Sequence, residues 1–170
     1  LTIEKAIRKK QLISYFLNKP TYLLLGKYHK NKMTKIFSIY KSKIINYGVD
    51  ETFYKTSLPE QNDTDLSFFV SRQDRNLNIL LDVWQNQVYP KRRKSKLFVT
   101  PIKEDLKKYN IFNRKMVDRD ELIKQLIISR MIIIPGHKAE LFCIAALEAS
   151  ELCIPIVTMG IGSLSERVEH

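Results

Sequence analysis

Along the last two thirds of the chain, short continuous apolar runs alternate with segments whose apolar residues recur every three to four positions. The runs are rich in β-branched and aromatic residues, so they predict buried strands, at residues 66–70, 96–100, 110–112, 131–135 and 154–158. The spaced segments predict helices at residues 76–89 and 120–129, and a third with Glu140 at its amino end. Such alternation predicts an α/β fold, a parallel sheet covered by helices.

The first third of the chain shows the same two patterns in shorter segments. Residues 1–17 and 27–40 carry apolar residues at helical spacing, and residues 21–26 and 42–48 are predicted to be short strands that end in glycine. Residues 55–63 are rich in Ser, Pro, Gln, Asn and Asp, which is typical of a linker. We therefore expect a helix–strand–helix–strand order before the linker.

Composition limits the size and class of the protein. The chain has 170 residues, 44% hydrophobic and 28% charged, which is enough for one core, or for one domain and a piece of another. Because it begins with Leu1 and stops where a new helix is predicted, we expect a fragment. The net charge of +11 favours anionic partners. An AT-rich coding sequence, which enriches Lys, Ile, Asn and Tyr together, explains this charge equally well.

Several classes of protein lack their usual signals in the sequence. No apolar run is long enough to cross a bilayer, no signal peptide is visible, and no Gly-rich P-loop occurs. Cys143 and Cys153 both stand in apolar context, which predicts free buried thiols in a reducing compartment. No cluster of Cys and His has the spacing of metal ligands, so we expect no metal.

The first candidate for chemistry is the loop at residues 71–76, which follows a predicted strand. Arg72 and Arg75 bracket the turn from this strand into the next helix. Ligands of parallel α/β sheets bind outside the carboxyl ends of the strands. Helix amides attract anions and guanidinium groups neutralise them, so this loop suits a diphosphate. The alternative is a pair of solvated surface arginines.

The second candidate is the segment at residues 135–149, in which seven residues separate Glu140 from Glu148. A carboxylate inside an apolar helical face is expensive to bury, so Glu148 needs a reason to be there. The alternatives are a lysine-paired or solvent-facing glutamate at 148 and a dipole-stabilising acid at 140. His137, in the loop before Glu140, could touch a phosphate but is more simply an incidental loop residue.

This segment resembles the donor-binding signature of the retaining glycosyltransferases of the GT-B fold, which have two Rossmann-like domains. The resemblance covers most of residues 43–170 and is carried by Pro135, Glu140, Glu148-Ala149, Pro155-Ile156-Val157, Gly162 and Glu166. It implies that Glu140 acts at the catalytic centre by hydrogen-bonding hydroxyls of the donor sugar. It also implies that backbone amides of Leu141, Phe142 and Cys143 meet the donor.

The resemblance assigns the remaining roles as well. Glu148 would accept hydrogen bonds from the ribose hydroxyls of the nucleotide, because an ionised carboxylate is purely an acceptor. Arg72 and Arg75 would bind the donor diphosphate. In the third loop, Gly160 and Gly162 would allow close backbone approach, and Ser163 with Glu166 would cap the next helix.

The resemblance also implies a domain organisation. Residues 45–50 and Phe53 look like the junction between the two domains of the family. Residues 1–41 would then be the tail of the acceptor-side domain, 42–63 the interdomain strand and linker, and 64–170 a truncated donor-binding domain. Such a fragment is expected to bind its donor weakly and to catalyse nothing alone.

The function that follows is transfer of a sugar from a nucleoside-diphosphate sugar to a saccharide or lipid-linked acceptor, with retention of configuration and without a metal. Peripheral membrane contact and a cytoplasmic location are expected. Leu141, Cys143 and Cys153 stand where the family commonly has glycine, so a decayed or binding-only relative is an alternative. A nucleic-acid-binding module is another, although basic residues cluster only at residues 91–94 and no aromatic platform accompanies them.

Overall fold

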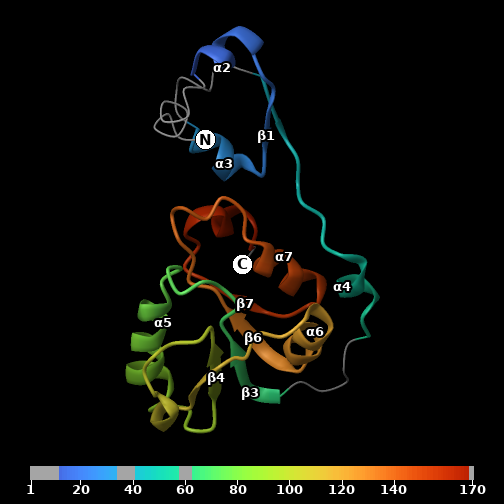
Figure 1. Cartoon of the computed structure of the whole chain (residues 1–170). Helices are drawn as coiled ribbons and strands as arrows, with labels where there is room; N and C mark the ends of the chain where they lie inside the picture. The colour runs from blue at the N-terminus through green and yellow to red at the C-terminus, as the bar shows by residue number, and fades with distance from the viewer. Residues whose placement is uncertain (1–11, 34–40, 58–62, 169–170) are drawn as a thin grey trace. The chain divides into compact units, whose positions relative to one another are not determined.

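The computed structural model describes residues 12–33, 41–57 and 63–168 and divides the chain into two compact units with the boundary after Tyr47 (Figure 1). Most of the helix predicted at residues 1–17, and part of the predicted linker, lie outside the described residues. The domain boundaries at residues 41 and 63 stay predictions.

The first unit contains a two-stranded sheet. Its described elements are α2 (Leu12–Asn18), β1 (Tyr22–Leu24), α3 (Lys27–Asn31) and β2 (Ser42–Ile44). β1 and β2 pair in parallel, with Tyr22 opposite Ser42, as expected of two strands joined by a helical crossover. The helix predicted over residues 27–40 is wrong in length, because α3 ends at Asn31; residues 34–40 lie outside the described residues.

The second unit is built on a five-stranded sheet whose neighbouring strands are all parallel. The strands are β3 (Asp63–Phe68), β4 (Lys96–Val99), β5 (Ile111–Asn113), β6 (Ser129–Ile133) and β7 (Ile156–Val157). Their order is β5-β4-β3-β6-β7, so the chain moves outward from β3 in one direction and then restarts at β6 in the other. This reversal opens a crevice at the carboxyl ends of β3 and β6, the usual ligand position in such sheets.

Helices cover both faces of this sheet, as predicted. The helical elements are α4 (Glu51–Lys55), α5 (Leu77–Val83) with the π-helical turn η1 (Trp84–Val88), η2 (Lys107–Tyr109), α6 (Arg119–Ile127), α7 (Ile144–Glu151) and η3 (Gly162–Glu166). Phe68 packs in a core with residues of α6 and α7, whereas the next residue, Phe69, packs in a second core with α5 and Trp84. Successive strand residues point to opposite faces, so α5 and α6 lie on opposite sides of the sheet (Figure 1).

Two aspartates start helices in this unit. The Asp118 carboxylate accepts a hydrogen bond from the Glu121 N–H at 2.9 Å, which confirms an acidic amino end for α6. The Asp50 carboxylate likewise accepts from the Thr52 N–H at 3.1 Å and starts α4. The sequence analysis predicted no helix there, because α4 is a short element and buries only Phe53.

The carboxyl end of α7 closes with a left-handed residue. The Ile154 N–H donates to the Ala149 carbonyl at 2.9 Å and the Cys153 N–H to the Ser150 carbonyl at 3.0 Å, the two bonds of a Schellman motif. Cys153 has φ 53°, the conformation that glycine adopts without strain. Its side chain is exposed, so the prediction of a buried thiol is right for Cys143 and wrong for Cys153.

Cys153→Gly is expected to raise the free energy of unfolding by about 0.5–1 kcal/mol, because it relieves a left-handed Cβ while adding some freedom to the unfolded chain. Cys153→Ala, which keeps the Cβ, is the control and should change the stability little. Urea unfolding of the three proteins measures the difference. Equal stability of the Gly and Ala variants would show that no strain is stored there.

Candidate functional site

One pocket of about 590 Å³ opens at the carboxyl ends of the central strands and the amino end of α7. Its walls come from the loops that follow β3, β4, β5 and β6. The lining residues are Val70, Ser71, Arg72, Arg75, Thr100, Arg114, Met116, Glu140, Phe142, Cys143, Ile144 and Ala145. The structure therefore brings the two arginines and the first glutamate of the sequence prediction into one site.

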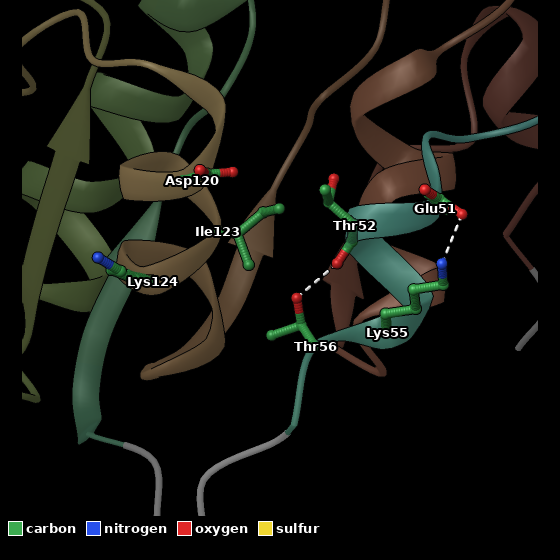
Figure 2. Close-up of a pocket in the computed structure, with 7 residues that line it drawn as sticks. All are labelled: Glu51, Thr52, Lys55, Thr56, Asp120, Ile123 and Lys124. Atoms are coloured by element: carbon green, nitrogen blue, oxygen red, sulfur yellow. Dashed lines mark hydrogen bonds and ion pairs between the residues drawn. The ribbon is translucent and has the colours of Figure 1, made fainter.

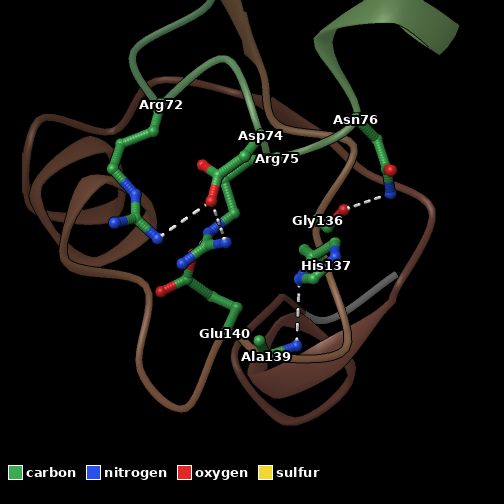
Figure 3. Close-up of polar contacts among 8 residues, drawn as sticks. All are labelled: Arg72, Asp74, Arg75, Asn76, Gly136, His137, Ala139 and Glu140. Carbon is green, nitrogen blue, oxygen red and sulfur yellow. Dashed lines mark hydrogen bonds and ion pairs between the residues drawn. The ribbon is translucent and has the colours of Figure 1, made fainter.

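A nearly buried ion pair crosses the crevice between the loops after β3 and β6. Arg75 Nε donates to Glu140 Oε2 at 2.8 Å, and the two side chains are 11% and 19% exposed. Arg75 Nη1 also lies 3.0 Å from Asp74 Oδ2, and Arg72 Nη2 lies 3.2 Å from the same oxygen. Figure 3 shows the Asp74 carboxylate between the two guanidinium groups. Sequence reasoning gave Asp74 no role, yet it partly neutralises both predicted diphosphate ligands.

Three further contacts fix the loop that carries Glu140. Asn76 Nδ2 donates to the Gly136 carbonyl at 2.6 Å (Figure 3). The Ser163 N–H donates to the Glu140 carbonyl at 3.0 Å. Gly162 has φ 78°, and a Cβ there would lie 2.3 Å from the His137 oxygen, so only glycine permits this approach. These contacts fix the backbone of the loop that carries Glu140, and with it one partner of the ion pair.

Some predicted features of these loops are wrong. Ser163 does not cap a helix: it lies buried inside the 3-10 helix η3, whose preceding residue Ile161 makes no side-chain cap. Glu140 does not begin α7, which starts only at Ile144, so it belongs to the loop. The His137 imidazole has a local role, since its Nδ1 accepts from the Ala139 N–H at 3.1 Å (Figure 3).

The pocket offers no activated nucleophile at Cys143. Burial raises the pKa of this thiol to about 11, and a backbone hydrogen bond from Ala146 offsets only part of the shift. The thiol is therefore protonated at neutral pH and behaves as an apolar lining group at the amino end of α7. Leu141, unlike Phe142 and Cys143, is not among the lining residues.

Glu148 stands on α7 one turn beyond the pocket, four residues after Ile144, and does not line the pocket. The side chain is half-buried, and burial raises the pKa of its carboxyl, with the positive charge of Arg119 acting in the opposite direction. Arg119 is itself engaged in an ion pair with Asp50. A half-buried carboxylate is suited to accept hydrogen bonds from hydroxyl donors.

Sequence reasoning did not select Thr100, Arg114 and Met116, which line the pocket after β4 and β5. Thr100 follows β4, and its Oγ1 donates to the Ser71 carbonyl at 2.5 Å. Arg114 follows β5 directly. The signal that could have found them is their place at the carboxyl ends of strands, the same rule that selected Arg72.

A second pocket, of about 410 Å³, lies between α4 and α6 (Figure 2). It is lined by Glu51, Thr52, Lys55, Thr56, Asp120, Ile123 and Lys124. None of these residues follows a strand of the five-stranded sheet, and Lys55 is already paired with Glu51 at 2.6 Å. We therefore place the candidate site in the first pocket.

Within residues 12–33, 41–57 and 63–168, no group of three or more His, Cys, Asp or Glu side chains is placed to hold a metal ion. No helix in these ranges is both long enough and apolar enough to cross a bilayer.

No family model and no curated protein matches the sequence. The structure, by contrast, matches sucrose-phosphate synthase from Thermosynechococcus elongatus with a TM-score of 0.64 at 13% identity, over 93% of this chain and 46% of that one. It also matches the pneumococcal O-GlcNAc transferase GtfA in complex with UDP and GlcNAc (0.60, 11%, 94% and 35%). A third match is Anabaena HepE in complex with UDP and glucose (0.59, 15%, 93% and 58%).

The chain has the fold of the GT-B glycosyltransferases. The fold class and the family resemblance predicted from the sequence are thereby confirmed. At 11–15% identity the likeness concerns the fold. The chain spans between about a third and three fifths of the length of these proteins.

Removing either partner of the Arg75–Glu140 pair leaves a nearly buried charge without its main partner. Arg75→Met and Glu140→Leu are each expected to lower the free energy of unfolding by about 3 kcal/mol. The double variant should lose clearly less free energy of unfolding than the sum of the two single losses, because it leaves neither charge of the pair without its partner. Guanidinium unfolding of the four proteins measures the coupling.

The exposed Glu51–Lys55 pair supplies the matched control for that cycle. Both side chains are 63% exposed, so Glu51→Leu, Lys55→Met and their combination should show a coupling below about 0.5 kcal/mol. Additive losses at Arg75 and Glu140 would contradict the coupling that the geometry indicates.

Glu148→Gln tests the raised pKa of the Glu148 carboxyl. Because deprotonation is harder in the folded chain than in the unfolded one, the ionised group destabilises the fold above its unfolded pKa. The glutamine variant should therefore melt at a higher temperature than wild type at pH 7. The difference should vanish below about pH 4, where Glu148 is protonated in both states. A pH-independent difference would contradict the shift.

Proposed function

We propose that this chain is the donor-binding part of a retaining glycosyltransferase, which transfers a sugar from a nucleoside-diphosphate sugar to a saccharide or lipid-linked acceptor. The observation that carries the proposal is the meeting of two elements of the donor signature at the switch point of the sheet. Arg75 and Glu140, 65 residues apart in sequence, lie 2.8 Å apart there. Such crevices are the ligand sites of doubly wound sheets.

The proposed role of the cationic groups is to stabilise the departing diphosphate. Negative charge grows on the diphosphate as the glycosidic bond breaks, so positive charge placed beforehand lowers the barrier. Arg72 and Arg75 line the pocket, and Ile144 and Ala145 bring the amino end of α7 to it. The positive end of that helix supplements the guanidinium groups. We propose no metal in this role.

Glu140 is the proposed ligand of the sugar hydroxyls. In the free chain it is paired with Arg75, so a diphosphate that binds Arg75 competes with this carboxylate. Once released, Glu140 can accept hydrogen bonds from the sugar at the mouth of the same pocket. Leu141, Phe142 and Cys143 are the proposed backbone contacts of the donor, and Glu148 is the proposed acceptor for the ribose hydroxyls.

The comparisons suggest which donor to test first. GtfA is described with UDP and GlcNAc, and HepE with UDP and glucose. We therefore propose a UDP-sugar as the first candidate. The acceptor side, peripheral membrane contact, a cytoplasmic location and the domain division at residues 41 and 63 belong to the same proposal. A nucleic-acid role has no comparable support in the pocket.

A binding-only relative is the second candidate, and one observation favours it. Cys143 is buried at the amino end of α7, so a side chain fills space in the pocket wall where the family commonly has glycine. A Cβ at this place limits how closely a phosphate can approach the backbone. A chain that binds a nucleotide but supports no transfer in its full-length protein would favour this candidate.

Calorimetric titration of the chain with UDP, GDP and ADP tests the proposed function. We expect saturable binding of one of the three nucleotides. Arg72→Ala and Glu148→Ala should each weaken it about tenfold, since each removes a hydrogen-bonding or charged partner of the ligand. Lys94→Ala, a basic residue outside the pocket, is the matched control. No binding of any nucleotide by the folded chain and by its full-length protein would refute the proposal.

A further inference from the structure

Arg114 is the pocket cation that the sequence analysis did not select. It stands directly after β5, and its N–H donates to the Val99 carbonyl at 2.7 Å, which continues the pairing of β5 with β4. The Asn113 side chain accepts from the Ile102 N–H at 2.8 Å and donates to the Ile102 carbonyl at 3.0 Å. The backbone that carries Arg114 is therefore fixed to the sheet.

The guanidinium of Arg114 lacks a protein partner among the described residues. Its Nε is buried without a hydrogen-bond acceptor, and no carboxylate in these ranges lies within ion-pair distance. Burial alone lowers the pKa of Arg114 from its ordinary value, and no neighbouring charge contributes. The group remains charged at neutral pH, because the ordinary pKa of an arginine lies far above neutrality.

The other two arginines of the pocket are in the opposite situation. Arg75 is engaged by both Glu140 and Asp74, and Arg72 by Asp74. An incoming anion gains less from a cation that already holds a carboxylate than from an unpaired one, because it must compete with that carboxylate. A half-buried cation without a partner costs free energy in the free chain and recovers it when an anion arrives.

We infer that Arg114 is the anion anchor of this pocket and binds a phosphate group of the ligand. In the free chain Arg75 ties the loop after β3 to the loop after β6, and it meets the diphosphate only once Glu140 has been displaced. The identity of that ligand as a nucleoside diphosphate rests on the proposed function. The anchoring of a phosphate by Arg114 does not, since it follows from the unpaired charge in the pocket wall.

Inorganic pyrophosphate is the direct probe, titrated into the chain by calorimetry beside UDP and uridine. We expect Arg114→Met to weaken pyrophosphate and UDP by roughly ten- to hundredfold, the range for a hydrogen bond between charged groups. Uridine, which carries no phosphate, should bind both proteins equally. Lys115→Met removes the same charge from the exposed next residue and is the matched control, with no expected loss.

Thermal unfolding separates an anchor from a merely structural arginine. Without ligand, Arg114→Met should melt at the same or a higher temperature than wild type, because an unpaired buried charge is gone. Pyrophosphate should raise the melting temperature of wild type and of Lys115→Met but not of Arg114→Met. If Arg114→Met does not fold, Arg114→Lys replaces it. This variant should retain part of the rise in melting temperature with pyrophosphate, since it keeps the positive charge but loses the bidentate geometry of the guanidinium.

The outcomes separate this inference from the proposed function. Pyrophosphate binding that requires Arg114, without binding of any nucleotide by the chain and by its full-length protein, would support the inference and refute the function. Nucleotide binding that survives Arg114→Met, or a loss that is equal for UDP and uridine, would refute the inference alone. No pyrophosphate binding by the folded wild-type chain, or an unaltered pyrophosphate shift in a folded Arg114 variant, would also refute it.

Discussion

The reversal of strand order between β3 and β6 is the constraint on which the site depends, and the Arg75–Glu140 ion pair spans it. At this point two loops leave neighbouring strands toward opposite faces of the sheet, so no backbone ladder joins them. Their union must come from side chains. The Arg75–Glu140 pair and the bond from the Asn76 side chain to the Gly136 carbonyl supply it. The close approach of Gly162 to His137 ties the loop after β7 to the same loop after β6. The charges that shape the pocket thus also hold its walls.

Most of the sheet could be predicted from sequence because its signal is local. Most strands contain or adjoin a short run of apolar residues, and burial on both faces makes that run continuous, as at Phe68-Phe69. Helices with an acidic cap, such as α6 behind Asp118, carry their start signal in the sequence as well. The loops after the strands could be selected by topology alone, which placed Arg72, Arg75 and Glu140 in one pocket.

The features that sequence missed are those decided by partners distant along the chain. Serine commonly caps helices, but the packing of the Ser163 loop on Glu140 buries this side chain. Cys153 adopts a left-handed conformation because the helix must end there for β7 to pair with β6, not because its residue type prefers it. The pairing of Arg75 with Glu140, 65 residues away, and the absence of a partner for Arg114 in the described chain depend on three-dimensional neighbours. Residue type alone could not distinguish the three pocket arginines, Arg72, Arg75 and Arg114.

Paired and unpaired cations have different roles in the pocket: one stabilises the structure and the other binds the ligand. A cation that fixes structure benefits from a permanent carboxylate, because the pair removes the cost of burial. A cation that binds a ligand must instead retain unsatisfied hydrogen-bonding capacity, and the fold has to tolerate that cost. Arg75, engaged twice and nearly buried, meets the first requirement, and Arg114, held on the end of β5 with a buried Nε, meets the second. Arg114 stands at the end of a strand, where the β4–β5 pairing and the Asn113 side chain hold its backbone before any ligand arrives. This anchoring keeps the unpaired guanidinium in the pocket wall.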